Sequence, residues 1–437
     1  MKAVLRQVIY DQKTLSFRDK IPREIPHHLI DVPEVLIVSG VRRCGKSVLL
    51  QQIRNQQREK DYFLNFDDDR LARFQVDHFQ DLYEVFIELF GEQKTFYFDE
   101  IQNITGWELF VRRLYDYGCK VFVTGSNANM LSRELGTHLT GRYVAHELYP
   151  LSFAEYLQLT GHTVSEPDLY TTAGVAGLTR RFNQYLVDGG FPQYVLTQNP
   201  DYLKSLYESV LYKDILVRNR LTNEKEMVEM IYYLASNTAT LSSYNSLART
   251  IGVKHPVTVK NYLGFLENTY LIFQIPKFDY SVRKQVANAR KTYFIDPALV
   301  RRIGFGFSEN SGRLLENLVF IELKRRGYEV FYHSGKGECD FLIRKENAIV
   351  HAIQVCHTLT DTNQKRELSG LLEAMTLHNL SDGLILTTNR EEQITVSGKE
   401  VRIALVWKWL LVGSRESIVE SRESRVVKSS RRKVAQS

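Results

Sequence analysis

The sequence predicts an α/β fold built on a parallel sheet with helices on both faces. The first observation is that short apolar runs, beginning with VLIVS at 35–39, alternate with helical patterns. Strands buried on both faces appear as such continuous apolar runs. The second observation is the composition, because the 437 residues are 43% hydrophobic and 25% charged. These values exclude a mostly disordered chain, a collagen-like chain and a disulfide scaffold.

Five apolar runs are the expected strands of this sheet. Apolar residues at three- and four-residue spacing lie between them, notably at 48–58 and 79–90, and this spacing indicates helices. A regular alternation of strand and helix is typical of parallel strands joined by crossover helices. The expected strands are 35–39, 62–66, 95–99, 120–124 and 142–148.

The sequence divides into four expected domains and a tail. Residues 1–150 form the α/β core, and residues 151–240, whose helical segments are separated by Gly and Pro, form a helical lid. Residues 241–305 show a helix, a short turn, a second helix and a small hairpin, which is the winged-helix arrangement. Residues 306–412 form a second α/β unit. The polar, basic segment 413–437 is expected to be a disordered tail.

Charge and cysteine content limit the class of protein. Lys and Arg number 57 against 51 Asp and Glu, a net charge of +6 that is compatible with a polyanionic partner such as DNA. None of the four cysteines belongs to a CxxC pair, so we expect no disulfide framework and no zinc cluster. No apolar run approaches the ~18 residues that span a bilayer. We therefore expect a soluble cytoplasmic protein without a membrane partner.

The sequence GVRRCGKS at 40–47 is the strongest functional signal. It fits the phosphate-binding pattern GxxxxGK[ST], and it stands between an apolar strand and a helix, as that pattern requires. Lys46 would reach the β- and γ-phosphates of ATP, and the Ser47 hydroxyl would bind Mg²⁺. The expected phosphate-contacting residues are Gly40, Val41, Arg42, Arg43, Cys44, Gly45, Lys46, Ser47 and Val48.

Two carboxylates end the apolar run at 95–99. Asp99 and Glu100 follow FYF, and the carboxyl ends of parallel strands are where open α/β sheets bind ligands. Asp99 is expected to hold the magnesium ion, and Glu100 to orient or deprotonate the attacking water. The alternative is an ordinary acidic turn after a strand.

Two further elements are candidates for a supporting role. TGSN at 124–127 ends another strand, where Asn127, in preference to Ser126, could sense the γ-phosphate or position the water. The alternative is an ordinary turn, because Gly, Ser and Asn favour turns. Arg142 stands just before the last strand and could act as an arginine finger, in the same chain or from a neighbouring subunit. The alternative is a solvated surface arginine.

These motifs resemble the AAA+-type P-loop ATP-binding proteins of bacteria and archaea that end in a restriction-nuclease-like domain. The matching pieces are SGVRRCGKS, FYFDEIQN, VFVTGSN, LTGRYVAHELYPLSFAEYL, DGGFPQYV and LYKDIL. The resemblance implies an ATPase core with a helical lid. It also implies that Lys46 and Asp99 bind nucleotide and magnesium, and that Glu100 is the catalytic acidic residue.

The winged-helix segment offers a candidate DNA-binding face. Its second helix would expose polar and basic side chains suited to phosphate contacts and to the major groove. The alternative is that this segment packs against the ATPase core or binds a partner protein. The residues concerned are Lys254, His255, Thr258, Lys260 and Asn261.

The last α/β unit offers a degenerate nuclease site. Restriction-type nucleases use a helix carboxylate, an Asp at a strand start and Glu-x-Lys on the next strand. Here Glu316, Asp340 and Gln354 take the carboxylate positions, but Cys356 replaces the lysine. A thiol carries no permanent positive charge, although Lys365 could substitute. We therefore expect binding rather than cleavage.

Together these patterns predict a Mg²⁺-dependent ATPase whose lid and later domains move when ATP binds. Three function classes stay open: a DNA-associated motor, an ATP-gated switch acting on a protein, and an ATP-regulated nuclease. They differ in whether DNA stimulates hydrolysis and whether Mg²⁺ supports DNA cleavage. The expected partners are a nucleotide, DNA, and either a second copy of the chain or another protein.

Overall fold

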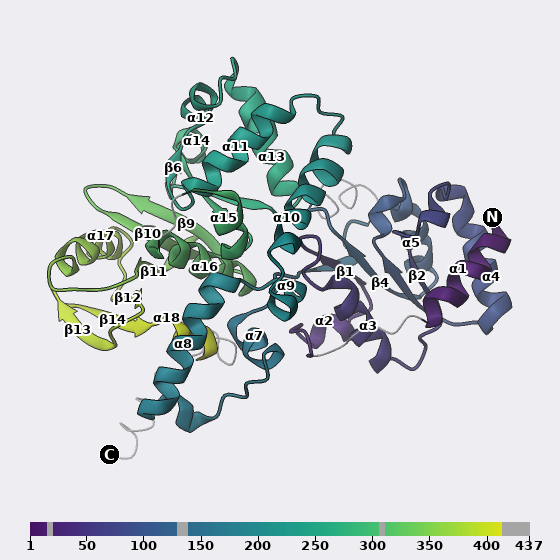
Figure 1. Ribbon diagram of the computed structural model, residues 1–437, viewed down its shortest axis with the longest axis horizontal. Helices are drawn as coiled ribbons and strands as arrows, with labels where there is room; N and C mark the ends of the chain where they lie inside the picture. Colours follow the sequence, from purple (N-terminus) through teal and green to yellow (C-terminus); the bar gives the residue numbers. More distant parts are fainter. Residues whose placement is uncertain (15–20, 129–138, 306–310, 413–437) are drawn as a thin grey trace. The chain divides into compact units, whose positions relative to one another are not determined.

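The computed structural model describes residues 1–14, 21–128, 139–305 and 311–412 (Figure 1). The expected disordered tail lies outside these residues. The chain forms two compact units. The first unit contains Met1–Pro150, Phe191–Val228 and Ala248–Phe273, and the second contains Leu151–Gly190, Glu229–Leu247 and the described residues from Gln274 onward.

The first unit is built on a five-stranded parallel sheet with the strand order β2-β3-β4-β1-β5. Strand β1 lies between β4 and β5, and the loop that follows it starts at the carboxyl edge of the sheet because it leaves the carboxyl end of that strand. Ligands of open α/β sheets bind at this edge. The strands are β1 Val35–Ser39, β2 Phe63–Asn65, β3 Thr95–Asp99, β4 Lys120–Gly125 and β5 Tyr143–Glu147.

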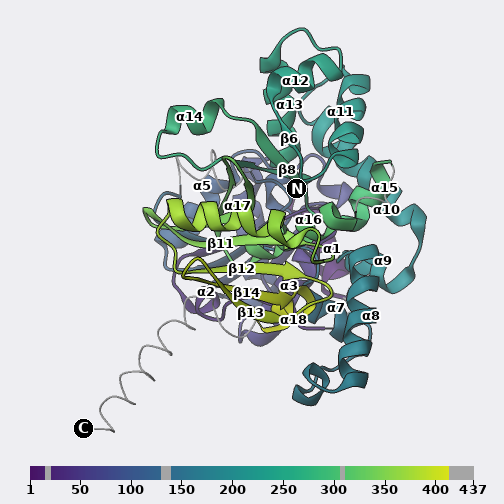
Figure 2. The same cartoon turned by 90° about the vertical axis from the view of Figure 1, so that its left-hand side faces the viewer.

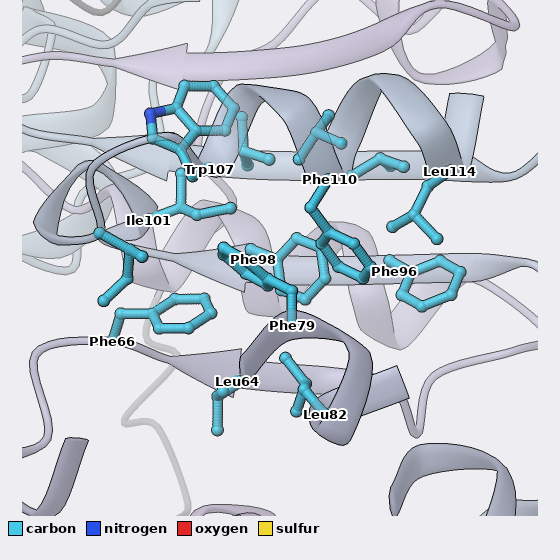
Figure 3. Packing of buried hydrophobic residues seen from close by; sticks show 14 of the residues in the cluster. Leu64, Phe66, Phe79, Leu82, Phe96, Phe98, Ile101, Trp107, Phe110 and Leu114 are labelled. Atoms are coloured by element: carbon cyan, nitrogen blue, oxygen red, sulfur yellow. The ribbon is translucent and has the colours of Figure 1, made fainter. Parts of the chain in front are cut away.

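Helices connect these strands and bury an aromatic-rich core against the sheet. Figure 3 shows Phe79 of α4 and Phe110 of α5 packed beside Phe96 and Phe98 of β3. The rings of Phe79 and Phe110 stack with centroids 4.6 Å apart, which adds to the stabilisation from burial. The helices of this region are α1 Lys2–Thr14, α2 His28–Asp31, α3 Lys46–Gln56, α4 Phe79–Phe90 and α5 Trp107–Asp116.

Later segments complete the first unit. A π-helix, Val210–Val217, follows directly from α10, and the residues after α13 return to the sheet, where the Tyr270 hydroxyl donates to Ser39 Oγ at 2.8 Å.

Elements α11, α12 and β7 each begin in one unit and end in the other. The expected lid and winged-helix segments therefore contribute to both units, and their boundaries stay predictions. The helices are α9 Pro192–Thr197, α10 Pro200–Ser209, α11 Glu224–Ser236, α12 Tyr244–Thr250 and α13 Pro256–Asn268.

The second unit contains a six-stranded mixed sheet with the order β13-β14-β12-β11-β10-β9. Strands β11, β12 and β14 are parallel to one another, and the outer pairs are antiparallel. Helix α17, Gln364–Leu377, packs over β10, β11 and β12 (Figure 2). The strands are β9 Glu329–Ser334, β10 Glu338–Lys345, β11 Ala348–Cys356, β12 Asp382–Thr387, β13 Glu392–Val396 and β14 Lys399–Leu405.

A small three-stranded sheet, in the order β6-β8-β7, precedes the large one along the chain. Its strands are β6 Leu241–Ser242, β7 Ile272–Pro276 and β8 Arg290–Phe294. The remaining helices of the unit are α7 Phe153–Leu159, α8 Thr172–Asp188, α14 Val282–Ala287, α15 Pro297–Ile303, α16 Ser311–Arg325 and α18 Val406–Val412. The predicted fold class, α/β with a parallel core sheet and a second α/β unit, is confirmed. Within the described ranges, every helix is too short or too polar to cross a lipid bilayer.

Candidate active site

The glycine-rich loop joins the end of β1 to the start of α3. Gly40 and Gly45 have φ angles of 152° and 109°, values that side chains rarely allow. A Cβ on Gly40 would collide with the carbonyl oxygen of Leu148, and one on Gly45 would collide with the guanidinium of Arg23. Only glycine therefore fits at either position. A glycine-rich turn that leads into a helix N-terminus is the backbone arrangement that binds phosphate in many proteins.

Lys46, the first residue of α3, folds back over this loop. Its Nζ donates to the carbonyl oxygens of Gly40 and Val41, both at 3.1 Å, and only 3% of its side chain is exposed. Nζ also lies 3.7 Å from Oε1 of Glu100. The structure therefore brings the loop lysine and the strand-end carboxylate together, as the sequence predicted.

Asp99, the last residue of β3, is completely buried. The Thr124 hydroxyl donates to its Oδ1, and Nδ2 of Asn65 donates to its Oδ2 at 3.0 Å. Burial and the neighbouring charge of Glu100 raise the pKa of Asp99 to about 6, although hydrogen bonds from Thr124 and Ser47 oppose this rise. A buried carboxylate next to a loop serine is the oxygen-rich pair that a magnesium ion needs, so Asp99 and Ser47 fit that ion.

Glu100 has left-handed backbone angles, φ 52° and ψ 39°, which are uncommon for a residue with a side chain. Its amide donates to Thr124 Oγ1 at 3.1 Å, and the Ser126 hydroxyl donates to its Oε2 at 3.1 Å. Burial acts to raise the pKa of Glu100. The charge of Lys46 and the hydrogen bond from Gln102 outweigh burial, so the pKa lies below its ordinary value. Glu100 is therefore an ionised base at neutral pH.

The turn after β4 contributes through residues other than the one that the sequence favoured. Thr124 and Ser126 contact Asp99 and Glu100 directly, whereas Asn127 is the next residue and is partly exposed. Ser126 therefore lies directly beside the Glu100 carboxylate. The γ-phosphate-sensing role of Asn127 stays a prediction.

Arg142 lies at the opposite edge of the sheet from the loop. Its carbonyl oxygen accepts a bond from the amide of Val35, the first residue of β1, and its Nε lies 3.2 Å from Asp116 Oδ1. The loop begins after Ser39, the last residue of β1, so about five residues of strand, or roughly 16 Å, separate the two. This placement does not favour an arginine finger acting within the same chain, and the arginine-finger role of Arg142, from the same chain or from a neighbouring subunit, stays a prediction.

The two loop arginines have different surroundings. Arg43 is exposed, whereas Arg42 is mostly buried and forms an ion pair with Asp214 of the π-helix. Sequence reasoning quoted LYKDIL without assigning Asp214 a role, and it gave no role to Asn65 or Gln102. Gln102 lies two residues after Glu100, within FYFDEIQN, so local spacing could have found it. Asp214 and Asn65 reach the site from other connections, and local spacing does not indicate them.

A second cluster of carboxylates lies in the second unit. Lys291 of β8, only 2% exposed, places its Nζ 2.9 Å from Oε1 of Glu316 and 3.0 Å from Oδ1 of Asp340. The hydroxyl of Tyr293 donates to Glu316 Oε1 at 2.7 Å. Burial and the charge of Asp340 raise the pKa of Glu316 to about 7, against the effect of Lys291. The structure thus joins Glu316 and Asp340, as predicted, but through a lysine that sequence reasoning missed.

Gln354, the third expected nuclease residue, makes hydrogen bonds with protein groups through both ends of its side-chain amide. Gln354 accepts from the amide of Asp340 at 3.2 Å and donates to Oε2 of Glu367 at 2.8 Å, so both ends of its amide are engaged. Burial raises the pKa of Cys356, and Lys365 is exposed on α17. Across the part of the chain that the structure describes, no group of three or more His, Cys, Asp or Glu is arranged to hold a metal ion.

Comparison with known proteins identifies the family. Residues 32–157 match the family model of an AAA domain, and residues 179–310 match a domain of unknown function, DUF8612. The chain is 34% identical over 432 residues to uncharacterized protein MJ1544 of Methanocaldococcus jannaschii, covering 94% of this chain and 96% of that protein. The chain belongs to the same family as MJ1544.

A second sequence relative aligns over a similar length, and a solved structure matches with much lower sequence identity. An uncharacterized protein of Haemophilus influenzae is 30% identical over 424 residues, covering 93% of this chain and 99% of that protein. AMPPCP-bound DnaA from Aquifex aeolicus is 16% identical, covering 55% of this chain and 84% of that chain, with a TM-score of 0.25. A TM-score this low supports no conclusion. The AAA domain of this MJ1544-family protein confirms the P-loop part of the resemblance and contains Lys46, Asp99 and Glu100.

Proposed function

We propose that this protein binds ATP together with Mg²⁺ and hydrolyses it. The observation that carries the proposal is the meeting of three elements at one sheet edge: the glycine loop, Lys46, and the Asp99–Glu100 pair. A cradle of backbone amides beside a lysine and two carboxylates matches what phosphoryl transfer requires, namely positioning and charge stabilisation.

Each residue has a distinct part in this proposal. The loop amides and the N-terminus of α3 hold the phosphates, and Lys46 exchanges its bonds to loop carbonyls for bonds to phosphate oxygens. Ser47 and Asp99 would hold Mg²⁺, which neutralises phosphate charge when bound. Glu100 accepts a proton from the attacking water, and Ser126 fixes the direction of the Glu100 carboxylate.

Nucleotide binding and hydrolysis by two variants test this proposal. Lys46→Ala should lose most ATP binding, because it removes the buried ammonium group that lies directly over the loop carbonyls. Glu100→Gln should bind ATP normally and lose turnover by roughly 10²-fold or more, because an amide cannot accept the proton. Normal hydrolysis by Glu100→Gln would show that the catalytic assignment is wrong.

We further propose that the ATPase is DNA-associated. The argument is the exposed face formed by α13 and the residues before it, where Lys254, His255, Lys260 and Asn261 are exposed and Thr258 is partly exposed. The expected result is a DNA-stimulated ATPase rate that falls as salt rises. A rate that DNA leaves unchanged would favour the ATP-gated protein switch.

The four free cysteines, all buried, support a reducing compartment such as the cytoplasm.

A nuclease activity is less well supported than ATP hydrolysis. We propose that the second unit is nuclease-like in fold and does not cleave, because Lys291 already neutralises the two carboxylates that would bind a metal. Incubation with plasmid DNA and Mg²⁺ or Mn²⁺ tests this proposal. Cleavage that disappears in Asp340→Ala would establish the ATP-regulated nuclease instead.

A further inference from the structure

Arg42, the third residue of the loop, forms a forked ion pair with Asp214. Its Nε lies 3.0 Å from Oδ2, and its Nη2 lies 3.3 Å from Oδ1. Only 17% of the Arg42 side chain and 6% of the Asp214 side chain are exposed. Two parallel N–H···O bonds fix the plane of a guanidinium as well as its charge. The pair therefore directs the loop arginine toward the segment that carries Asp214.

That segment is the π-helix Val210–Val217. Such helices are rare and are frequently found at functional sites. The neighbouring Lys213 donates to Oδ1 of Asp67 at 3.1 Å, and Oδ2 of Asp67 lies 4.0 Å from Nη1 of Arg42. The π-helix is thus tied to the phosphate loop by the buried Arg42–Asp214 pair, and to Asp67, which follows β2, by a more exposed pair.

The same guanidinium also lies within the electrostatic reach of the catalytic carboxylate. The charges of Arg42 and Glu100 influence each other's pKa, raising that of Arg42 and lowering that of Glu100. A triphosphate in the loop would bring further negative charge to this place. Because Asp214 already occupies the Nε and Nη2 donors of Arg42, a phosphate that takes the same two donors would compete with Asp214 for them.

We propose that Arg42 exchanges Asp214 for the terminal phosphate of ATP, which makes Asp214 a positioning residue and the π-helix a sensor of the bound nucleotide. This inference rests on the proposed function. ADP lacks the terminal phosphate and leaves the Arg42–Asp214 pair closed. ATP opens the pair and frees the π-helix from the loop. The difference in binding free energy between ATP and ADP is then available to drive a conformational change.

The affinities of Asp214→Asn for ADP and for a non-hydrolysable ATP analogue test the exchange. Removing the competing charge should tighten binding of the ATP analogue by about threefold to tenfold and leave ADP binding unchanged. Glu208→Gln is the matched control, because Glu208 is an exposed acidic residue of the adjoining helix α10 and pairs only loosely with Lys204, at 4.0 Å. It should change neither affinity.

Two results would overturn the exchange. If Asp214→Asn weakens or leaves unchanged the binding of both nucleotides, Asp214 is only a structural support of the loop. Hydrogen exchange of the wild-type protein gives a measurement that needs no variant: the amides of 210–217 should exchange faster with the ATP analogue than with ADP. Equal exchange would contradict the sensor role. If the wild type binds neither nucleotide, the proposed function itself fails, which is a distinct outcome.

Discussion

Two lysine–carboxylate clusters, one in each unit, differ in what surrounds the ammonium group. In the first unit Lys46 donates to two loop carbonyls and stays 3.7 Å from Glu100. In the second unit Lys291 contacts Glu316 at 2.9 Å and Asp340 at 3.0 Å. The first lysine is held by neutral groups that it can leave, whereas the second is bonded directly to the charges that it neutralises.

The difference indicates which cluster can accept a charged ligand. Asp99 is held by the neutral donors Thr124 and Asn65, so a cation can still bind to its charge. Glu316 and Asp340 already share a buried cation, and an added metal would have to displace it. Similar residue types therefore produce an internal ion pair in the second unit and, in the first, a carboxylate whose charge no lysine neutralises by direct contact at hydrogen-bond distance.

Replacing each lysine with methionine gives the largest expected difference between the clusters. Lys291→Met should lower the free energy of unfolding by about 3–5 kcal/mol, because it leaves two buried carboxylates unpaired. Lys46→Met should lower it by about 1 kcal/mol, since it removes hydrogen bonds to loop carbonyls. Urea denaturation at pH 8 measures both.

A matched double variant sharpens this prediction. Asp340→Asn should restore part of the stability lost in Lys291→Met, because it removes one of the two unpaired charges. The loss should also be smaller at pH 6, since the raised pKa of Glu316, about 7, lets that carboxyl take up a proton. Equal losses for Lys46→Met and Lys291→Met would show that the two clusters do not differ as described.

The next largest expected effect is a dependence of the free energy of unfolding on pH, caused by the buried carboxyl group of Asp99. Its folded pKa of about 6 is above its ordinary value, so the unfolded chain releases this proton first and stability falls as pH rises from about 4 to 6. Asp99→Asn removes that loss. Without nucleotide or metal, the variant should gain about 1–3 kcal/mol over the wild type across this window and keep the gain above pH 6. A difference that does not vary with pH would contradict the buried-carboxylate description.

The smallest effect concerns the turn after β4. Ser126→Ala should lower the turnover number by about threefold to tenfold with little change in ATP affinity, because it removes one hydrogen bond that orients Glu100. Asn127→Ala tests the residue that the sequence favoured. A larger loss of turnover for Asn127→Ala than for Ser126→Ala would reverse the assignment made from contacts.

Local patterns predicted the elements that depend on local sequence. The apolar runs matched β1 to β5 closely, and the loop with Asp99 and Glu100 followed from strand ends and glycine spacing. The pairing of Arg42 with Asp214 spans 172 residues, and that of Lys291 with Asp340 spans 49. Such pairs depend on tertiary packing, which spacing along the chain does not encode.

Arg142 shows a different limit of local patterns. It is near the turn after β4 in sequence, but the register of β5 pairs Tyr143 with Val35, at the start of β1. Nearness in sequence to a functional turn therefore did not mean nearness in space, because a parallel strand begins at the edge opposite to the one where its neighbour ends.

The most direct test of the central claim is single-turnover hydrolysis of ATP, with protein in excess over nucleotide and Mg²⁺ present. We predict that Glu100→Gln binds ATP as the wild type does and hydrolyses it more slowly by roughly 10²-fold or more, whereas Glu316→Gln hydrolyses it at the wild-type rate. A wild-type rate for Glu100→Gln, or an equal loss in Glu316→Gln, would contradict a catalytic site at the phosphate loop.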